Sequence, residues 1–243
     1  MLNQFSRTEL LLGKEAMERL SRARVAVFGI GGVGGYTVEA LVRSGVGAID
    51  LIDDDKVCLT NLNRQIIATR STVGKYKAEV MRDRILDINP DCKVEVHKCF
   101  YLPETRDEFD FSSYSYVVDA VDTVTAKIAL VMQAKETGTP IISSMGTGNK
   151  LRPDLLTACD ISKTTTCPLA RVMRRELRAR GIEHLRVVYS TEPPRTPKNR
   201  TAAPAPGQPR PKDTPGSSPW VPSSAGLLIA SEVIARLLGE AEW

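Results

Sequence analysis

Short apolar runs alternate with longer amphipathic segments along most of the chain. Runs rich in Val, Ile and Tyr, which are typical of strands, lie at 25–28, 47–53, 92–100, 114–119, 140–145, 155–160 and 185–189. Helical periodicity is found at 3–20 (one or two helices), after Gly34, and at 73–88, 124–137, 168–180 and 223–238. Strands that alternate with helices predict an α/β protein with a Rossmann-like, mostly parallel sheet covered by helices on both faces.

A glycine loop follows the first apolar run. The loop places glycines at Gly29, Gly31, Gly32 and Gly34, and the second apolar run ends in Asp53. Glycines let the backbone approach phosphate oxygens, the helix that follows turns its N–H groups toward the anion, and an acid after the second strand can accept bonds from ribose hydroxyls. The pattern indicates a nucleotide site, most often for NAD or FAD. Glycines needed only for close packing are an alternative.

The stretch after Asp53 is unusual for a dinucleotide enzyme. It carries Asp55, Asn61, Arg64 and Gln65 close to where phosphates would lie. An NAD enzyme normally continues here into its next strand–helix unit and has no use for such a cluster.

Two lysines, Lys75 and Lys77, open the helix predicted at 73–88. Cations in a first turn oppose the helix dipole, so an anion bound between them would explain their position.

Two carboxylates end the strand predicted at 114–119. Asp119 and Asp122 lie at the carboxyl end of this strand, the edge where open α/β sheets bind ligands. They suit Mg²⁺ that is bridged to phosphates. Capping of the following helix by Asp122 is an alternative that is compatible with this role.

Composition narrows the function classes. The chain has 243 residues, a net charge of +4 and a pI near 8.8, which permits a polyanionic partner without requiring one. Five cysteines form no CxxC pair and there are two histidines, so neither a zinc knuckle nor a multi-histidine metal site is indicated. We expect no membrane span, because no apolar run approaches roughly 20 residues, and a cytoplasmic location, because the N-terminus lacks a signal peptide's apolar core.

Two basic segments stand out near the C-terminal end. Five arginines lie within the helix predicted at 168–180, which is either a solvated face or an anion-binding surface. Residues 192–222 hold most of the 15 prolines, and we expect a mobile insertion that does not pack on the core. The apolar helix predicted at 223–238 then packs back onto the sheet or into a subunit interface. We expect a single domain over 1–243.

Together these features resemble the ThiF/MoeB/HesA family, which is related to the adenylation domains of ubiquitin-activating enzymes. The pieces that carry the resemblance are Arg7, the loop Gly29–Gly34, Asp53, Asn61-Leu-Asn-Arg64-Gln65, Lys77 and Asp119-Ala-Val-Asp122. The resemblance implies the ThiF/MoeB-type adenylation fold, with ATP on the glycine loop and its ribose on Asp53.

The resemblance also implies roles for individual side chains. Asn61, Arg64 and Lys77 contact the phosphates, and Asp122 serves Mg²⁺. Arg7 reaches the ATP of the other subunit, which implies a homodimer.

Within this family the chain is most similar to the tRNA threonylcarbamoyladenosine dehydratase branch. That branch adenylates the threonylcarbamoyl carboxylate of a modified tRNA adenosine and closes it into a ring. The alternatives are an adenylating activator of a ubiquitin-like or sulfur-carrier protein, against which the missing CxxC pairs argue, and a nucleotide-binding regulator. A thiol-acceptor role for Cys167, a cysteine-desulfurase-type partner and the surface that binds tRNA stay open.

Overall fold

A mixed sheet forms the centre of the computed structural model, which describes residues 3–199 and 215–240. Within these residues the sheet has seven strands in the order β3-β2-β1-β4-β5-β7-β6, and only the β6–β7 pair is antiparallel. The strands are β1 (Arg24–Phe28), β2 (Ala48–Ile52), β3 (Lys93–His97), β4 (Tyr116–Asp119), β5 (Ile141–Ser144), β6 (Leu156–Asp160) and β7 (Arg186–Ser190). The predicted α/β fold is confirmed.

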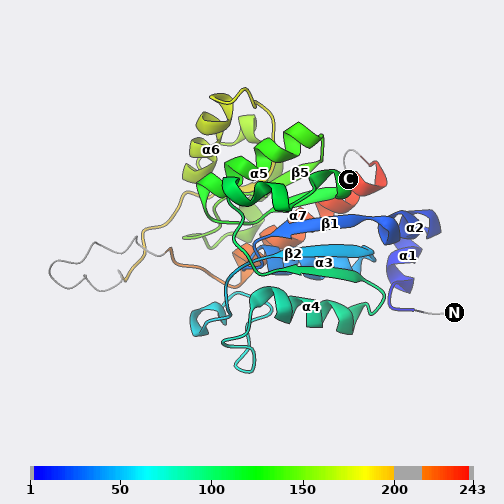
Figure 1. The fold of residues 1–243 in the computed structure, drawn as a ribbon. Coiled ribbons are helices and arrows are strands. Elements are labelled where there is room, and N and C mark those ends of the chain that lie inside the picture. Colours follow the sequence, from blue (N-terminus) through cyan, green and yellow to red (C-terminus); the bar gives the residue numbers. More distant parts are fainter. Residues whose placement is uncertain (1–2, 200–214, 241–243) are drawn as a thin grey trace.

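Helices cover both faces of the sheet, as predicted. One face carries α2, α3, α4 and α7, and the other carries α5 and α6 (Figure 1). The helices are α1 (Ser6–Leu12), α2 (Lys14–Arg22), α3 (Gly34–Arg43), α4 (Lys77–Ile88), α5 (Val124–Thr137), α6 (Pro168–Arg178) and α7 (Trp220–Leu238). Short 3₁₀ turns are η1 (Leu59–Asn61), η2 (Pro103–Glu108), η3 (Phe111–Ser113), η4 (Pro153–Leu155) and η5 (Ile161–Lys163).

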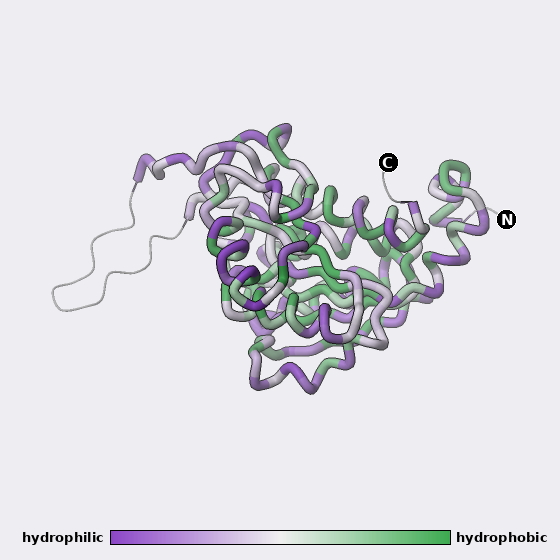
Figure 2. Tube along the Cα trace, turned by 90° about the horizontal axis from the view of Figure 1, so that it is seen from above, coloured by the Kyte–Doolittle hydropathy of each residue, from purple (hydrophilic) through white to green (hydrophobic). Residues whose placement is uncertain are grey.

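Strand β1 shows how the two cores form. Successive side chains of a strand point to opposite faces. Val25 and Val27 therefore join the cluster under α3 and α7, and Ala26 and Phe28 join the cluster under α5 and α6. All four are fully buried, so β1 reads as a continuous apolar run rather than an alternating one. Figure 2 shows these apolar segments in the interior, with hydrophilic segments around them.

Helix α7 is a core helix. It begins at Trp220, three residues before the predicted start, and packs mainly against α3. At Gly226 a Cβ would lie 2.4 Å from the carbonyl oxygen of Val33, so only glycine permits this approach. Among the described residues α7 has the length and apolar composition of a membrane span, which corrects the expectation that no run is long enough. Its packing on α3 and the sheet accounts for its apolar character.

Helix α4 begins later than predicted. Its first residue is Lys77, so Lys75 precedes the helix and does not stand in its first turn. The predicted apolar face is confirmed in Ala78, Met81 and Ile85, which are fully buried.

The ends of the Pro-rich segment pack against the protein, contrary to the expectation for 192–222. Glu192 is buried and its carboxylate accepts bonds from the N–H groups of Leu151 and Arg152, both at 2.9 Å. These bonds make the start of the segment part of the core's polar boundary. Residues 200–214, where the expectation of mobility mainly falls, lie outside the described residues.

One residue holds both ends of this segment. The carbonyl oxygen of Asn149 accepts a bond from the N–H of Arg195 at 2.8 Å, and its side-chain oxygen accepts one from the N–H of Gly216 at 2.7 Å. The N–H of Asn149 donates back to the carbonyl oxygen of Gly216 at 2.7 Å. Asn149 has a left-handed φ of 58°, a conformation that asparagine tolerates better than most residues. We call this arrangement the Asn149 clamp.

Candidate functional site

A cavity of about 290 Å³ opens at the carboxyl ends of the central strands. The chain proceeds from β1 to β2 and β3 on one side and then crosses to β4 on the other, so the strand order reverses between β1 and β4. Open α/β sheets bind ligands at such a switch point. The residues that follow β3, β2, β1 and β4 line the cavity in that spatial order.

The glycine loop forms the floor of the cavity, and two of its glycines are required by the fold. Gly29 has a φ of 90°, and a Cβ there would lie 2.7 Å from the carbonyl oxygen of Ala120. A Cβ on Gly34 would lie 1.8 Å from the carbonyl oxygen of Gly29. Packing thus explains Gly29 and Gly34.

Packing does not explain Gly31. The nearest atom to a Cβ built there is Nε2 of Gln65, at 3.9 Å. Gly31 lines the cavity, so a side chain at this position would occupy space that a ligand can use. Gly32 is intermediate, since its Cβ would lie 3.3 Å from Pro222 and 3.4 Å from Arg64.

Asp53 ties the second strand to the glycine loop. Its Oδ2 accepts a bond from the N–H of Ile30 at 2.7 Å, and its Oδ1 accepts one from the N–H of Asp55 at 2.9 Å. Burial raises the pKa of Asp53, although the nearby Lys77 ammonium, 3.7 Å from Oδ1, acts in the opposite direction. The carboxylate is thereby fixed at the cavity wall, where its remaining acceptor capacity can serve a ligand hydroxyl.

Lys77 brings a nearly buried positive charge to the cavity. Its Nζ lies 2.6 Å from Oδ2 of Asp55, which pairs it with a carboxylate that is mostly exposed. Because the ammonium is held in place and water is largely excluded, an anion in the cavity would interact with it more strongly than with a surface lysine.

The segment around η1 supplies amide groups and a guanidinium. The side-chain oxygen of Asn61 accepts a bond from the N–H of Cys58 at 3.0 Å. Arg64 is anchored through one nitrogen to the carbonyl oxygen of Thr60 at 3.1 Å, which leaves other donors toward the cavity. Oε1 of Gln65 is buried with no hydrogen-bond partner among the described residues. An orphaned buried acceptor on a cavity wall indicates a missing donor.

The two aspartates after β4 have different roles, which corrects the prediction that both suit Mg²⁺. Asp119 is fully buried and pairs with the buried Lys127, whose Nζ lies 3.0 Å from Oδ1. Ser143 also donates a short hydrogen bond to Asp119, so this carboxylate is already satisfied. The pair is a structural element beneath the cavity.

Asp122 lines the cavity and is exposed. The prediction that it caps the next helix is wrong, because the N-cap of α5 is Thr123 and no side chain caps that end. Within the described residues no group of three or more His, Cys, Asp or Glu could hold a metal. One free carboxylate fits Mg²⁺ only where ligand phosphates complete the coordination.

The far end of the cavity is apolar. It is lined by Ile52, Cys99, Phe100, Tyr101 and Val121. A base can stack there, while the glycine loop and the cations lie toward β1 and β4.

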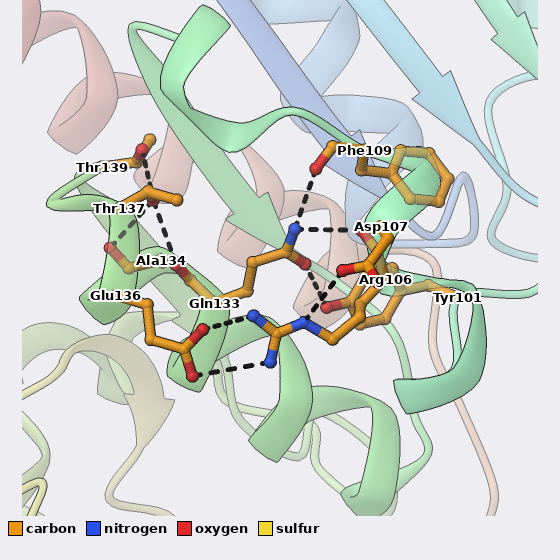
Figure 3. Close-up of polar contacts among 9 residues, drawn as sticks. All are labelled: Tyr101, Arg106, Asp107, Phe109, Gln133, Ala134, Glu136, Thr137 and Thr139. Atoms are coloured by element: carbon orange, nitrogen blue, oxygen red, sulfur yellow. Dashed lines mark hydrogen bonds and ion pairs between the residues drawn. The ribbon is translucent and has the colours of Figure 1, made fainter.

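A buried glutamine anchors this apolar wall (Figure 3). Gln133 accepts a bond from the Tyr101 hydroxyl at 2.6 Å and donates to the carbonyl oxygens of Arg106 and Phe109 at 3.0 and 2.8 Å. Every polar atom of the Gln133 amide is thus used to fix the segment after β3 against α5.

Sequence patterns missed part of the lining. Thr147 follows β5 at the carboxyl edge, and its glycine-flanked loop was a detectable signal. Ser217 and Pro222 come from the end of the Pro-rich segment. No sequence signal placed them here, because the Asn149 clamp is a long-range contact.

Arg7 is not brought to this cavity. It is exposed on α1 and is absent from the lining residues. In Figure 1, α1 and α2 lie beside the end from which β1 starts, opposite the carboxyl edge.

Comparison with known proteins agrees with this geometry. The ThiF family model matches residues 5–243. A Bacillus subtilis protein, tRNA threonylcarbamoyladenosine dehydratase, is 44% identical over 247 residues, covering 100% of this chain and 97% of its own length. The Escherichia coli tRNA threonylcarbamoyladenosine dehydratase TcdA, solved in complex with AMP, superposes with a TM-score of 0.87 at 35% identity, covering 98% of this chain and 95% of that one. The complex of the same enzyme with ATP gives a TM-score of 0.86. The chain therefore belongs to the ThiF family.

Proposed function

We propose that the chain is an ATP-dependent tRNA threonylcarbamoyladenosine dehydratase. The observation that carries the proposal is one cavity that joins an apolar wall, a glycine floor with open space at Gly31, and the cations Arg64 and Lys77. This order suits the base, ribose and phosphates of ATP. The relatives named above, similar over nearly the whole chain, support the same reaction.

The first step is adenylation. The carboxylate of the threonylcarbamoyl group attacks the α-phosphorus of ATP, an acyl–oxygen–phosphorus bond forms, and pyrophosphate leaves. Arg64 and Lys77 stabilise the charge that builds on the leaving phosphates, and the fixed positions of these groups reduce the reorganisation needed in the transition state. Asp53 holds the ribose hydroxyls and so sets the register of the α-phosphate.

The second step closes the ring. The ureido oxygen of the same threonylcarbamoyl group attacks the activated carbonyl, the proton is lost to solvent, and AMP leaves. The product has lost one water relative to the substrate, with the oxygen carried away on AMP. Because both reacting groups belong to one substituent, proximity supplies much of the rate, and no cysteine nucleophile is required.

We further propose that Asp122 holds Mg²⁺ together with the ATP phosphates. Its exposed carboxylate at the phosphate end of the cavity supports this assignment. Bound Mg²⁺ would neutralise phosphate charge during adenylation.

We also propose a homodimer in which Arg7 completes the partner's site. The position of Arg7 away from its own cavity supports this arrangement, because the guanidinium can then serve only a second copy. The remaining committed features, one adenylation domain over 1–243 and a cytoplasmic location, are part of the same proposal.

The test uses tRNA that carries threonylcarbamoyladenosine. The protein is incubated with this tRNA, ATP and Mg²⁺, the RNA is digested, and the modified nucleoside is weighed. We expect the mass of one water to be lost, with one AMP formed per nucleoside. An unchanged mass refutes the dehydratase, and ATP–pyrophosphate exchange that depends instead on a Gly-Gly-tailed carrier protein would identify a carrier-activating enzyme.

A further inference from the structure

Helix α6 is strongly two-faced. Its buried side chains are Ala170, Met173 and Leu177, spaced i, i+3 and i+7, and they pack into the core beside α5. This apolar stripe fixes which side of α6 faces outward.

The outward side is a continuous face of arginines. Its members recur at i, i+3, i+4 and i+7, and together they line a groove of about 480 Å³: Arg171, Arg174, Arg175 and Arg178. At 1.5 Å per residue the face extends about 10 Å along the helix. We call these four residues the α6 arginine face.

Few acids oppose the α6 arginine face. Glu176 lies 2.8 Å from Arg175 but is shared with Arg180 at 3.1 Å. Arg174 donates to the carbonyl oxygen of Thr164 at 2.7 Å, and among the described residues no ion pair includes Arg171 or Arg178. Like charges at these spacings destabilise a helix, so folding alone does not account for the face.

The α6 arginine face begins beside the nucleotide cavity. A Cβ on Gly146 would lie 3.9 Å from both Sγ of Cys167 and Cβ of Leu169, and the next residue, Thr147, lines the cavity. The start of α6 is therefore next to the mouth of the cavity, and the arginines lead away from it. In Figure 1, α6 lies toward the carboxyl edge of the sheet, away from α1 and α2.

We propose that the α6 arginine face binds backbone phosphates of the tRNA whose modified adenosine enters the cavity. This inference rests on the proposed function. The face is made of arginine and contains no lysine, and the planar guanidinium fork matches phosphate oxygens in a two-point contact. A polyanion also removes the repulsion among the four charges, so bound RNA stabilises what the free helix tolerates.

The test compares two variants that each lose three positive charges. The first is R171Q/R175Q/R178Q, which leaves Arg174 and its bond to Thr164 intact. The matched control, R22Q/K93Q/K135Q, removes charges that line grooves at the opposite edge of the sheet. The whole protein is titrated against an unmodified tRNA transcript by fluorescence anisotropy at several salt concentrations.

The α6 variant should bind tRNA about 10-fold or more weakly at 0.15 M salt, and the slope of log K against log[salt] should fall by about 2, because each lost phosphate contact removes close to one released counterion. The control should stay within about 2-fold of the unmodified protein. In turnover, KM for tRNA should rise while kcat and the affinity for ATP stay the same. The variant R171K/R175K/R178K, which keeps the charge, should recover most of the binding.

The outcomes separate this inference from the proposed function. Equal tRNA affinity for the α6 variant and the control, with both folded, overturns the α6 assignment even if dehydration proceeds. Weaker binding of the α6 variant by a protein that never dehydrates the nucleoside supports the surface and refutes the dehydratase. If R171Q/R175Q/R178Q does not fold, the single variants R171Q and R178Q decide, with a slope change of about 1 expected for each.

Discussion

The glycine loop offers a sharp test, because two of its glycines are required for different reasons. Gly34 lies where a Cβ would be 1.8 Å from a backbone oxygen, and no rotamer of any side chain can relieve that contact. Gly31 lies where a Cβ would meet protein only at 3.9 Å. Gly34→Ala should therefore damage the fold, and Gly31→Ala should damage ligand binding.

The magnitudes follow from these distances. Gly34→Ala forces a shift of the backbone at the start of α3, at a cost of about 3 kcal/mol or more, as for other overpacked sites. For a chain of this length that lowers Tm by roughly 6–12 °C. Gly31→Ala restricts the unfolded chain without a clash, which is worth about 0.4–1 kcal/mol of added stability. Its methyl group displaces the bound phosphates, and we expect ATP to bind at least ~10-fold more weakly, or about 1.4 kcal/mol.

Thermal unfolding followed by circular dichroism, with and without saturating ATP, separates the two effects. Unmodified protein should gain Tm when ATP is added, Gly31→Ala should start at least as stable and gain little, and Gly34→Ala should start low. Calorimetric titration gives the ATP affinity directly. Normal ATP affinity in Gly31→Ala refutes the assignment of the open space to the ligand, and a normal Tm in Gly34→Ala refutes the steric argument.

Three further predictions concern single side chains. Arg64→Ala should abolish AMP formation and leave Tm within a few degrees, because its contacts to the protein are exposed; AMP release at the normal rate would contradict the phosphate role. Lys127→Met strands the fully buried Asp119 carboxylate and should cost about 3–5 kcal/mol in urea unfolding, whereas a loss below ~1 kcal/mol would mean that the pair is dispensable. Burial alone would raise the pKa of Asp50, but hydrogen bonds from His97 and Arg24 outweigh it and leave the pKa lowered. A lowered folded pKa gives stability that is present above the unfolded pKa of about 3.9 and is lost as pH falls through the folded one, so Asp50→Asn should flatten the acid limb of the stability curve, and an unchanged limb would be evidence against this coupling.

Local patterns were sufficient for the sheet and for much of the site. The apolar run of β1, the glycines at its end and Asp53 after β2 are all set within one strand–helix–strand unit, so their spacing along the chain fixes their spacing in space. Asn61, Arg64, Gln65 and Lys77 follow directly in sequence and line the same cavity.

What depends on long-range contacts was not predictable. Asp119 and Asp122 look alike in sequence, and only the buried Lys127 on α5 distinguishes them. Proline content suggested a segment without packing, yet proline does not prevent Glu192 from accepting two backbone bonds from Leu151 and Arg152. The start of α7 at Trp220 was hidden by Pro222, because proline is tolerated in the first turn of a helix.

The Asn149 clamp makes the Pro-rich segment a module. Since one residue bonds the backbone at Arg195 and at Gly216, the chain between them is a loop whose two ends are already joined at the cavity mouth. The entropy of closing such a loop grows slowly, by about 0.6 kcal/mol for each doubling of its length. Insertions, deletions or whole grafted sequences between the clamped positions therefore have little influence on where Ser217 and α7 sit. Evolution, or an engineer, can rewrite what is carried above the active site without redesigning the site itself.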